Sequence, residues 1–204
     1  MARGPGAQRD AQLQRLGDAA VRVLARDGLP ALTFRTVAAE AGVSPGRVQH
    51  YARTSHGLVA LTFHRIQELA QQRIREAAAA LPAPSPTDLI AATLRSLIPR
   101  DDHDRVVMQV AATVELHALT DSDLAEQLRA GRSELIGFLA EQLRDAVPER
   151  PDDNPSPTRA ATMLLATAEG LSSLTMSRAI DGTEAVSLLD ESIQAALGHA
   201  TAQS

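Results

Sequence analysis

The feature that most constrains the fold is a pair of short helical segments around a tight turn, in TFRTVAAEAGVSPGRVQHYA (33–52). Thr33 is a suitable N-cap for the first segment, and Gly42 follows its last apolar residue, where a left-handed residue can end a helix. Ser44 can cap the second segment. Pro45 would then take its first position, where the missing N–H costs nothing. Two helices joined in this way predict a helix-turn-helix.

Helical patterns continue through the rest of the chain. The alternation typical of strands is absent and only 2% of the residues are aromatic, so we predict an all-α fold of about nine helices. A first helix should end at Gly28, and a long one should run from Thr54 or Ser55 to about Leu81. Five more should follow, the last of them capped by Thr183.

The proline-rich stretch PAPSP (82–86) is the clearest boundary, because it cannot continue a helix. We therefore predict three parts. An N-terminal arm and the helix-turn-helix occupy 1–54, a long connecting helix occupies 55–81, and a second helical domain occupies 82–204. The length of 204 residues is enough for one sizeable core or two small domains.

The composition predicts a chain without disulfides, membrane spans or a secretion signal. It contains no cysteine, which favours an intracellular compartment. No apolar run reaches the roughly 18 residues that a transmembrane helix needs. The N-terminus MARGPGAQRDAQLQR lacks the apolar middle of a signal peptide. We therefore expect a cytoplasmic protein with no membrane partner.

Charge is distributed unevenly along the chain. Residues 1–75 hold 11 arginines against five acidic residues, a net charge of +6, in a chain whose net charge is −5. A basic first part suggests a polyanion-binding module, with a chance distribution as the alternative. All 20 basic residues are arginine, but the acidic part shares this feature, so a coding bias explains it better than function does.

The second helix of the predicted helix-turn-helix carries side chains suited to DNA. Only Val48 clearly belongs in a core, and Gly46 permits a close approach. Arg47 can pair with guanine O6 and N7, and Gln49 with adenine N6 and N7. His50 can bond a phosphate. The alternative is that these polar residues form only the solvated face of a short helix.

Residues 9–63 resemble the DNA-binding domain of the TetR family of bacterial regulators. The similarity lies in LTFRTVAAEAGVSPGRVQHY and in the Gly-Leu pair at 57–58 that opens the long helix. The resemblance implies a homodimer on a palindromic double-stranded DNA operator. Its two recognition helices would enter successive major grooves about 34–36 Å apart, or a multiple of that distance.

Carried over position by position, the resemblance implies two groups of DNA-contacting residues. The base-facing group is Pro45, Gly46, Arg47 and Gln49. The phosphate-facing group is Thr33, Arg35, Ser44, His50, Tyr51 and Ser55, with Arg53 as a further cation.

The sequence departs from the family pattern in three places. The family usually has Tyr at the position of Gln49 and Phe at that of Ala52, and it has Lys followed by an acid where Ser55 and His56 stand. Ala52 leaves space behind the recognition helix that other side chains must fill. Ser55 removes a phosphate cation that Arg53 can replace. Gln49 should alter which base is read.

Residues 86–198 resemble the C-terminal domain of the BetI type of this family, through LRSLIPRDDHDR and ELHALTDSDLAEQLR. The last two helical segments, AATMLLATAEGLSSLTMSRA and AVSLLDESIQAAL, are too apolar for isolated surface helices. We therefore predict that they form the dimer interface, with ordinary intrachain packing as the alternative.

Polar and methionine side chains inside apolar runs are the candidates for binding a small-molecule effector. They are Met108, Glu115, His117, Glu169, Ser173 and Met176. A surface or interface position is the alternative for each polar one. The scarcity of aromatic residues argues mildly against a choline-like effector. We predict a repressor that an effector releases from its operator; an effector-free DNA-binding dimer is the alternative.

No pattern for catalysis, a cofactor or a metal is found. The acidic residues Asp101, Asp102 and Asp104 surround His103, but at a helix start they favour the helix dipole over a metal. The histidines lack zinc spacing, and no nucleophile elbow or phosphate loop occurs. We therefore expect no cofactor and no enzymatic activity.

Overall fold

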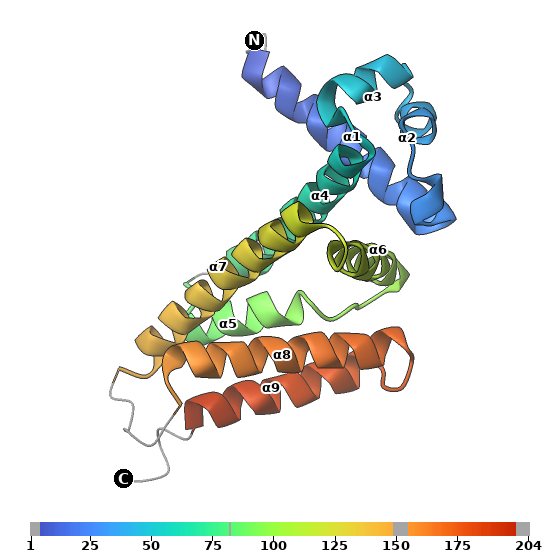
Figure 1. The fold of residues 1–204 in the computed structure, drawn as a ribbon. Helices are drawn as coiled ribbons and strands as arrows, with labels where there is room; N and C mark the ends of the chain where they lie inside the picture. The colour runs from blue at the N-terminus through green and yellow to red at the C-terminus, as the bar shows by residue number, and fades with distance from the viewer. Residues whose placement is uncertain (1–4, 82, 149–154, 199–204) are drawn as a thin grey trace. The chain divides into compact units, whose positions relative to one another are not determined.

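The computed structural model describes residues 5–81, 83–148 and 155–198 (Figure 1). These residues form nine α-helices, one 3-10 helix and no strand, which confirms the predicted all-α fold. The elements are α1 (Pro5–Asp27), η1 (Leu29–Ala31), α2 (Phe34–Ala41), α3 (Pro45–Ala52), α4 (Ser55–Ala79), α5 (Pro86–Arg95), α6 (Asp102–Ala118), α7 (Ser122–Ala146), α8 (Pro157–Met176) and α9 (Gly182–Gly198). The first four residues of the predicted arm lie outside the described part, and residues 5–9 belong to α1.

The chain divides into two compact units. The first unit combines the chain up to Leu69 with Gln109–Leu124, and the second combines Ala70–Met108 with the chain from Ala125 onward. The boundaries fall within α4, α6 and α7, so these three helices each contribute to both units. No helix among the described residues is both long and apolar enough to cross a membrane.

The core of the first unit lies between α1 and the helices that follow it. Its fully buried apolar side chains include Leu16, Val23, Val37, Val48 and Leu58. α1 and α4 pack closely at Gly17, where a Cβ atom would lie 2.7 Å from the Cβ of Arg65. Arg65 in turn bonds Asp18 through Nε and Oδ1 at 2.6 Å.

Helix α2 begins and ends as the sequence predicts. The Thr33 hydroxyl accepts the backbone N–H of Thr36 at 3.2 Å, and the Thr36 hydroxyl lies 3.0 Å from the backbone N–H of Thr33. This reciprocal pair satisfies two N–H groups that a helix start leaves open. Gly42 ends the helix at φ 65°, the left-handed region that glycine adopts without strain.

Two predicted N-caps differ in the structure. Ser44 precedes α3, but its hydroxyl makes no capping bond. At α9, the carboxylate of Asp181 accepts the backbone N–H groups of Thr183 and Glu184 at 2.8 and 2.9 Å, so Asp181 and not Thr183 is the cap. The helix starts at Gly182, two residues earlier than a Thr183 cap implies, and this places Asp181 at the capping position.

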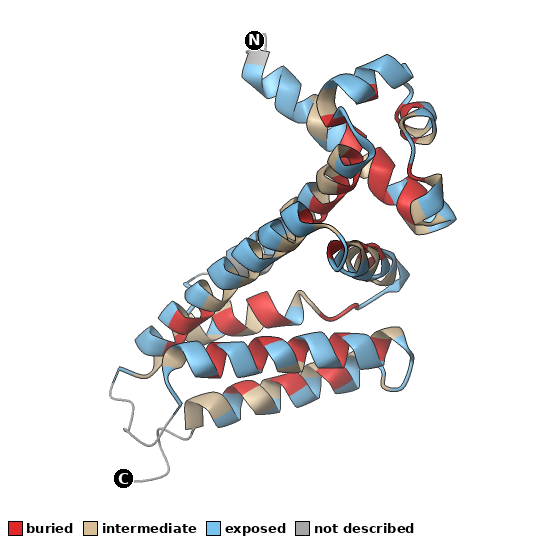
Figure 2. Cartoon of the chain, in the orientation of Figure 1, coloured by how far each residue is buried: buried red, intermediate tan, exposed pale blue. Residues whose placement is uncertain are grey.

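The core of the second unit is formed by α5, α7, α8 and α9. Buried residues recur along α8 and α9 with exposed positions between them (Figure 2). Ile90 and Leu94 from α5 pack with Leu139 and Leu143 from α7, together with Leu189 from α9 and the small and branched residues of α8. This interleaving of apolar stripes is the packing that helical periodicity predicts.

The acidic residues at the start of α6 have two different roles. Asp101 caps the helix by accepting the Asp104 N–H at 2.8 Å, as expected for an acid at a helix start. Asp104 itself is buried, with Arg73 at 2.5 Å and Arg100 at 3.0 Å from its two oxygens. Burial raises the pKa of this carboxyl, but the Arg100 hydrogen bonds and the charges of both arginines outweigh burial and hold the pKa below its usual value.

Candidate nucleic-acid interface

Helix α3 turns one face to the core and the other to solvent. Val48 and Ala52 are buried, at 0% and 6% exposure, and they hold the helix against the first unit. The exposed positions on the same helix are Pro45, Gly46, Arg47, Gln49 and His50, and Tyr51 is half-buried. The small side chain of Ala52 therefore suffices to seat α3 where the family usually has an aromatic residue.

His50 and Tyr51 lie side by side on this helix. Their rings meet edge to face, with centroids 5.2 Å apart and an interplanar angle of 87°. This edge-to-face arrangement is a favourable one for two neighbouring rings. It leaves the imidazole exposed and the phenol half-buried at the end of α3.

The segments that flank α3 expose the remaining predicted phosphate contacts. Thr33, Arg35, Ser44, Arg53 and Ser55 are all exposed. Arg53 follows α3 with φ 52°, an uncommon value for a side chain larger than glycine, and its N–H bonds the Gln49 carbonyl at 2.9 Å. The eleven predicted DNA-contacting residues thus all belong to the first unit.

The turn after α3 is tight and requires a glycine. A Cβ atom on Gly57, in the first turn of α4, would overlap the backbone carbonyl of Ala52. The Thr54 hydroxyl accepts the Gly57 N–H at 3.0 Å. The glycine in the Gly-Leu pair at 57–58 is therefore needed to bring α4 against the end of α3.

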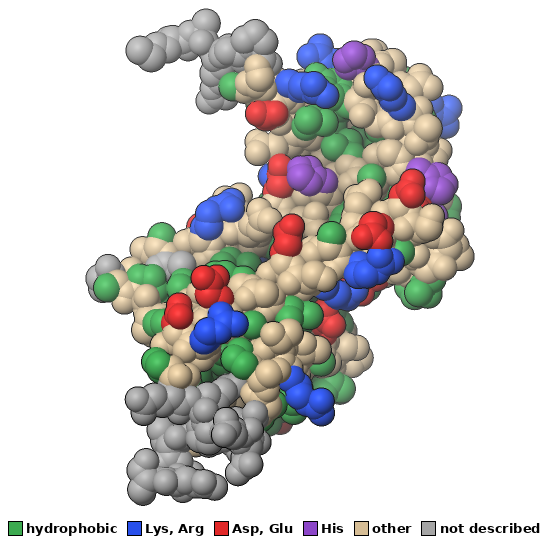
Figure 3. All heavy atoms as spheres, turned by 60° about the vertical axis from the view of Figure 1, so that its left-hand side comes forward, with side chains coloured by type: hydrophobic (Ala, Val, Ile, Leu, Met, Phe, Trp, Pro, Cys, Tyr) green, Lys and Arg blue, Asp and Glu red, His purple; other side chains and the backbone are tan. Residues whose placement is uncertain are grey.

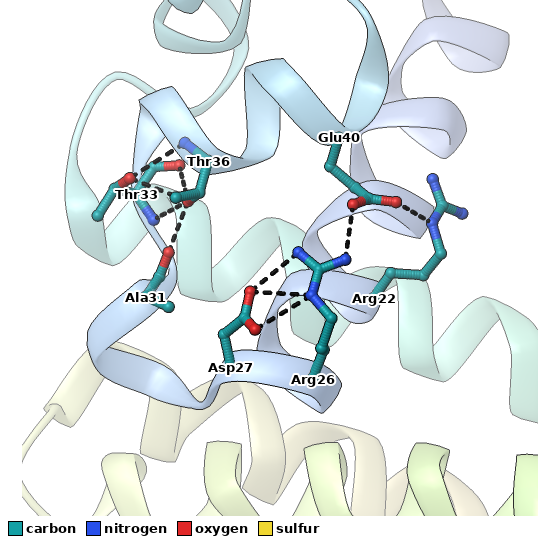
Figure 4. A network of polar contacts seen from close by, with 7 residues as sticks. All are labelled: Arg22, Arg26, Asp27, Ala31, Thr33, Thr36 and Glu40. Carbon is teal, nitrogen blue, oxygen red and sulfur yellow. Dashed lines mark hydrogen bonds and ion pairs between the residues drawn. The ribbon is translucent and has the colours of Figure 1, made fainter.

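The arginines of the first unit fall into two groups. Arg22 and Arg26 bond Glu40 at 2.7 and 3.1 Å, and Arg26 also bonds Asp27, so these charges join α1 to α2 (Figure 4). The side-chain hydrogen bonds of Arg22 and Arg26 lower the pKa of Glu40. These arginines, like Arg65, are neutralised by nearby carboxylates and add little to an outward-facing positive field.

In the second group, no arginine side chain has a hydrogen bond or ion pair with a described residue. The group consists of Arg9, Arg15, Arg35, Arg47 and Arg53. Arginine and histidine side chains stand at the surface around the helix-turn-helix, at the top of Figure 3. Because these guanidinium groups have no partner in the described part of the chain, they remain available to an anionic ligand.

Arg15 belongs to this group, although no sequence pattern indicates it. A guanidinium nitrogen of Arg15 lies 3.5 Å from the position that a Cβ would take on Gly42, beside the turn between α2 and α3. Nothing in the local sequence around Arg15 indicates this placement, because it depends on how α1 crosses α2.

The six predicted effector contacts do not gather in one unit. Glu115 and His117 belong to the first unit. The second unit holds Met108, Glu169, Ser173 and Met176, of which Glu169 and Ser173 are exposed on α8. Glu169 accepts a hydrogen bond from Arg132 at 3.2 Å.

Two cavities lie elsewhere. One of about 100 Å³ is bounded by α1 and α4, and its lining includes Asp10, His64 and Glu68. One of about 450 Å³ opens between α8 and α9 and is lined mainly by small or apolar side chains, namely Pro155, Ala160, Met163, Leu164, Thr167, Ser192, Ala195 and Ala196. None of the six predicted effector contacts lines either cavity. Among the described residues, no group of acidic or histidine side chains is arranged to hold a metal ion.

The outer face of α8 and α9 is apolar in part. Met163, Leu174 and Leu188 are 58%, 45% and 39% exposed. Small residues stand between them on α8, with Ala166 and Gly170 exposed. Apolar side chains beside small ones form a surface that another helix pair can approach closely.

Comparison with known proteins gives two family matches. Residues 16–62 match the model of bacterial regulatory proteins of the tetR family, and residues 86–198 match that of the BetI-type transcriptional repressor C-terminal domain. No curated protein matches the chain.

Solved structures share the fold over nearly the whole chain. A transcriptional regulator from Rhodococcus sp. Rha1 is 26% identical, with a TM-score of 0.78, over 92% of this chain and 97% of its own. A regulator from Pseudomonas aeruginosa PAO1 is 20% identical, with a TM-score of 0.75, over 97% and 95%. A regulator from Saccharomonospora viridis, solved in complex with choline, is 14% identical, with a TM-score of 0.74, over 91% and 96%. With both parts matched, the chain belongs to the TetR family of bacterial transcriptional regulators.

Proposed function

We propose that this regulator is a cytoplasmic repressor that binds a palindromic DNA operator as a homodimer and leaves it when a small molecule binds. One observation carries the DNA-binding part. Helix α3 is fixed by Val48 and Ala52 and exposes Arg47 and Gln49, neither of which is engaged by the side chain of another described residue. A short helix held in this way can enter a major groove.

Base reading is assigned to the exposed side of α3. Arg47 offers two parallel N–H groups to a guanine edge, and Gln49 offers a donor and an acceptor to an adenine edge. Pro45 and Gly46 add little bulk, so the helix start can approach the bases closely.

Phosphate contacts are assigned to the exposed groups around α3. The cations are Arg35 and Arg53, to which we add Arg15 because of its place beside the α2–α3 turn. The uncharged or titratable donors are Thr33, Ser44, His50, Tyr51 and Ser55. Hydroxyl, imidazole and helix-start N–H groups position a protein on DNA without reading its sequence.

The dimer interface is assigned to α8 and α9. The exposed Met163, Leu174 and Leu188 and the 450 Å³ groove between the helices form a surface that the same helices of a second copy would cover. Such an isologous contact would give the two recognition helices the twofold symmetry of a palindrome.

The effector part rests on the match to the BetI-type domain and on the likeness to a choline-bound regulator. Phe138 is the single aromatic residue from 82 onward, so an aromatic cage for a quaternary ammonium group is not available there. We therefore propose an effector other than choline; within the second unit, the candidate side chains for binding it are Met108, Glu169, Ser173 and Met176. The dimer is released from its operator if the effector binds only the conformer in which the spacing of the two recognition helices does not match the operator.

Selection of bound sequences from a random DNA pool tests this proposal. We expect enrichment of a palindrome, and an affinity that falls linearly with the logarithm of salt concentration. A ligand screen on the selected operator then tests release. Enrichment of no sequence, or a flat salt response, would refute the DNA-binding part. A screen without any releasing compound would favour the effector-free dimer.

A further inference from the structure

A hydrogen bond within the first unit joins the start of α4 to the turn after α6. Nδ1 of His56 lies 2.7 Å from Oδ2 of Asp121, 65 residues along the chain. We propose that His56 is a positioning residue, whose bond to Asp121 fixes the first turn of α4 and thereby holds α3 in place for DNA. This inference rests on the proposed DNA binding and adds a residue that none of the predicted contacts includes.

The carboxylate of Asp121 is positioned to accept this hydrogen bond. Its other oxygen, Oδ1, accepts the Leu124 N–H at 3.1 Å and caps α7, and its side chain is only 10% exposed. The N–H of Leu124 and the hydrogen bond from His56 outweigh partial burial and keep the pKa of Asp121 below its usual value. An ionised carboxylate only accepts hydrogen bonds, so Nδ1 of His56 is the donor. The His117 ring lies beside the pair, with its centroid 5.9 Å from that of His56.

The first turn of α4 is in turn fixed to the end of α3. The Thr54 N–H, one residue before α4, bonds the carbonyl of Ala52, the last residue of α3, at 2.5 Å. Gly57 lies directly against the Ala52 carbonyl. A shift of the residues around His56 is therefore transmitted to the C-terminal end of α3, where His50 and Tyr51 stand.

The exposure of His56 separates its positioning role from a role in stability. The His56 side chain is 70% exposed, so solvent screens its bond to Asp121, and the bond contributes little to the stability of the fold. Its loss should leave the protein folded while loosening the angle of α3. The family usually has an acid at this position, so the contact to Asp121 is a feature of this chain.

A double-mutant cycle on the selected operator tests the inference. The changes are His56→Ala and Asp121→Ser, because serine can still cap α7 but is too short to reach His56. We expect each change alone to weaken operator binding about two- to fivefold, and the double variant to bind no more weakly than either single one. His56→Asn should restore binding, since its amide nitrogen can take the place of Nδ1. Fluorescence anisotropy measures the Kd at constant salt, and thermal melting checks the fold.

His64→Ala is the matched control. His64 also lies exposed on α4, but it faces Glu68 of the same helix at 3.5 Å. Its removal should not change the Kd. Additive losses from the two single changes, unchanged affinity in both, or no rescue by asparagine would overturn the positioning role. A wild-type chain that binds no DNA would overturn the proposed function along with it.

Discussion

The exposed arginines of the first unit are of two kinds: some are paired with carboxylates of the protein, and others are available to bind an anion. Arg22 and Arg26 are paired with Glu40, whereas Arg35 and Arg47 have no partner among the described residues. Residue type alone does not distinguish the two kinds, because both are arginines on exposed helix faces. The available arginines are the ones whose replacement should change DNA binding directly.

Arg47→Ala should weaken operator binding by about 1–3 kcal/mol and relax the preference at one base pair, because a bidentate contact to guanine is lost. The measurement is the Kd on the operator and on its single-base variants. Arg35→Ala is the comparison, since loss of a phosphate contact weakens all sequences alike. Uniform weakening by Arg47→Ala would instead assign Arg47 to phosphate.

Gly57→Ala should unfold or severely destabilise the first unit, since the new Cβ would overlap the Ala52 carbonyl. Gly46→Ala is the matched control. A Cβ there meets no atom within 4 Å, so its free energy of unfolding should stay within about 1 kcal/mol of the wild type. Urea unfolding measures both. Equal stability of the two variants would contradict the tight turn between α3 and α4.

Between helices, ion pairs add specific contacts to the packing of apolar side chains. Arg65 on α4 bonds Asp18 on α1 within the first unit. Arg73, further along α4, bonds the buried Asp104 on α6 within the second. Because α4 carries both contacts, it is held in each unit by a specific partner as well as by packing.

Asp104→Asn should lower the free energy of unfolding by about 2–4 kcal/mol at pH 7, since it leaves Arg73 without its buried partner. The folded-state pKa of Asp104 lies below the unfolded value. Its contribution is therefore complete above the ordinary Asp pKa of about 3.9 and is lost as pH falls through the folded pKa. The difference between variant and wild type should shrink accordingly in urea unfolding below about pH 4.

Asp102→Asn is the control for this measurement. The Asp102 side chain is fully exposed, and its approach to Arg105 is 3.9 Å. Its replacement should change stability by less than about 0.5 kcal/mol. A loss as large as that of Asp104→Asn would show that acidic charge at the start of the α6 dipole, rather than the buried pair, supplies the effect.

The proposed dimer of the whole molecule depends on an exposed apolar surface and not on a sequence motif. The apolar side chains exposed on α8 and α9 have no cover within the described chain. In the proposed dimer they would be buried, and the symmetry of that contact would set the spacing of the DNA-binding helices.

Leu188→Glu should convert a dimer to a monomer, because it places a charge inside the proposed interface. Sedimentation velocity measures the change. Leu116→Glu is the control, since Leu116 is 69% exposed on α6, away from α8 and α9 in the chain, and should leave the dimer intact. A Leu188→Glu variant that remains dimeric would rule out this interface.

By itself, the sequence determined the helical class and the helix-turn-helix. The Thr33 cap, the left-handed Gly42 and the apolar Val48 are signals carried by a few neighbouring residues, and local chemistry is enough to interpret them. The same local reasoning put the wrong residue at the start of α9, where Asp181 replaces Thr183 as the cap.

Only the tertiary structure decided which charges are used within the protein. The pairs Arg73–Asp104 and His56–Asp121 join residues far apart in sequence, and Arg15 reaches the α2–α3 turn through the crossing of two helices. No periodicity or spacing encodes such contacts, because each depends on how whole helices pack. The helix proposed to face DNA could thus be predicted from its own residues, while the contacts that hold it required the fold.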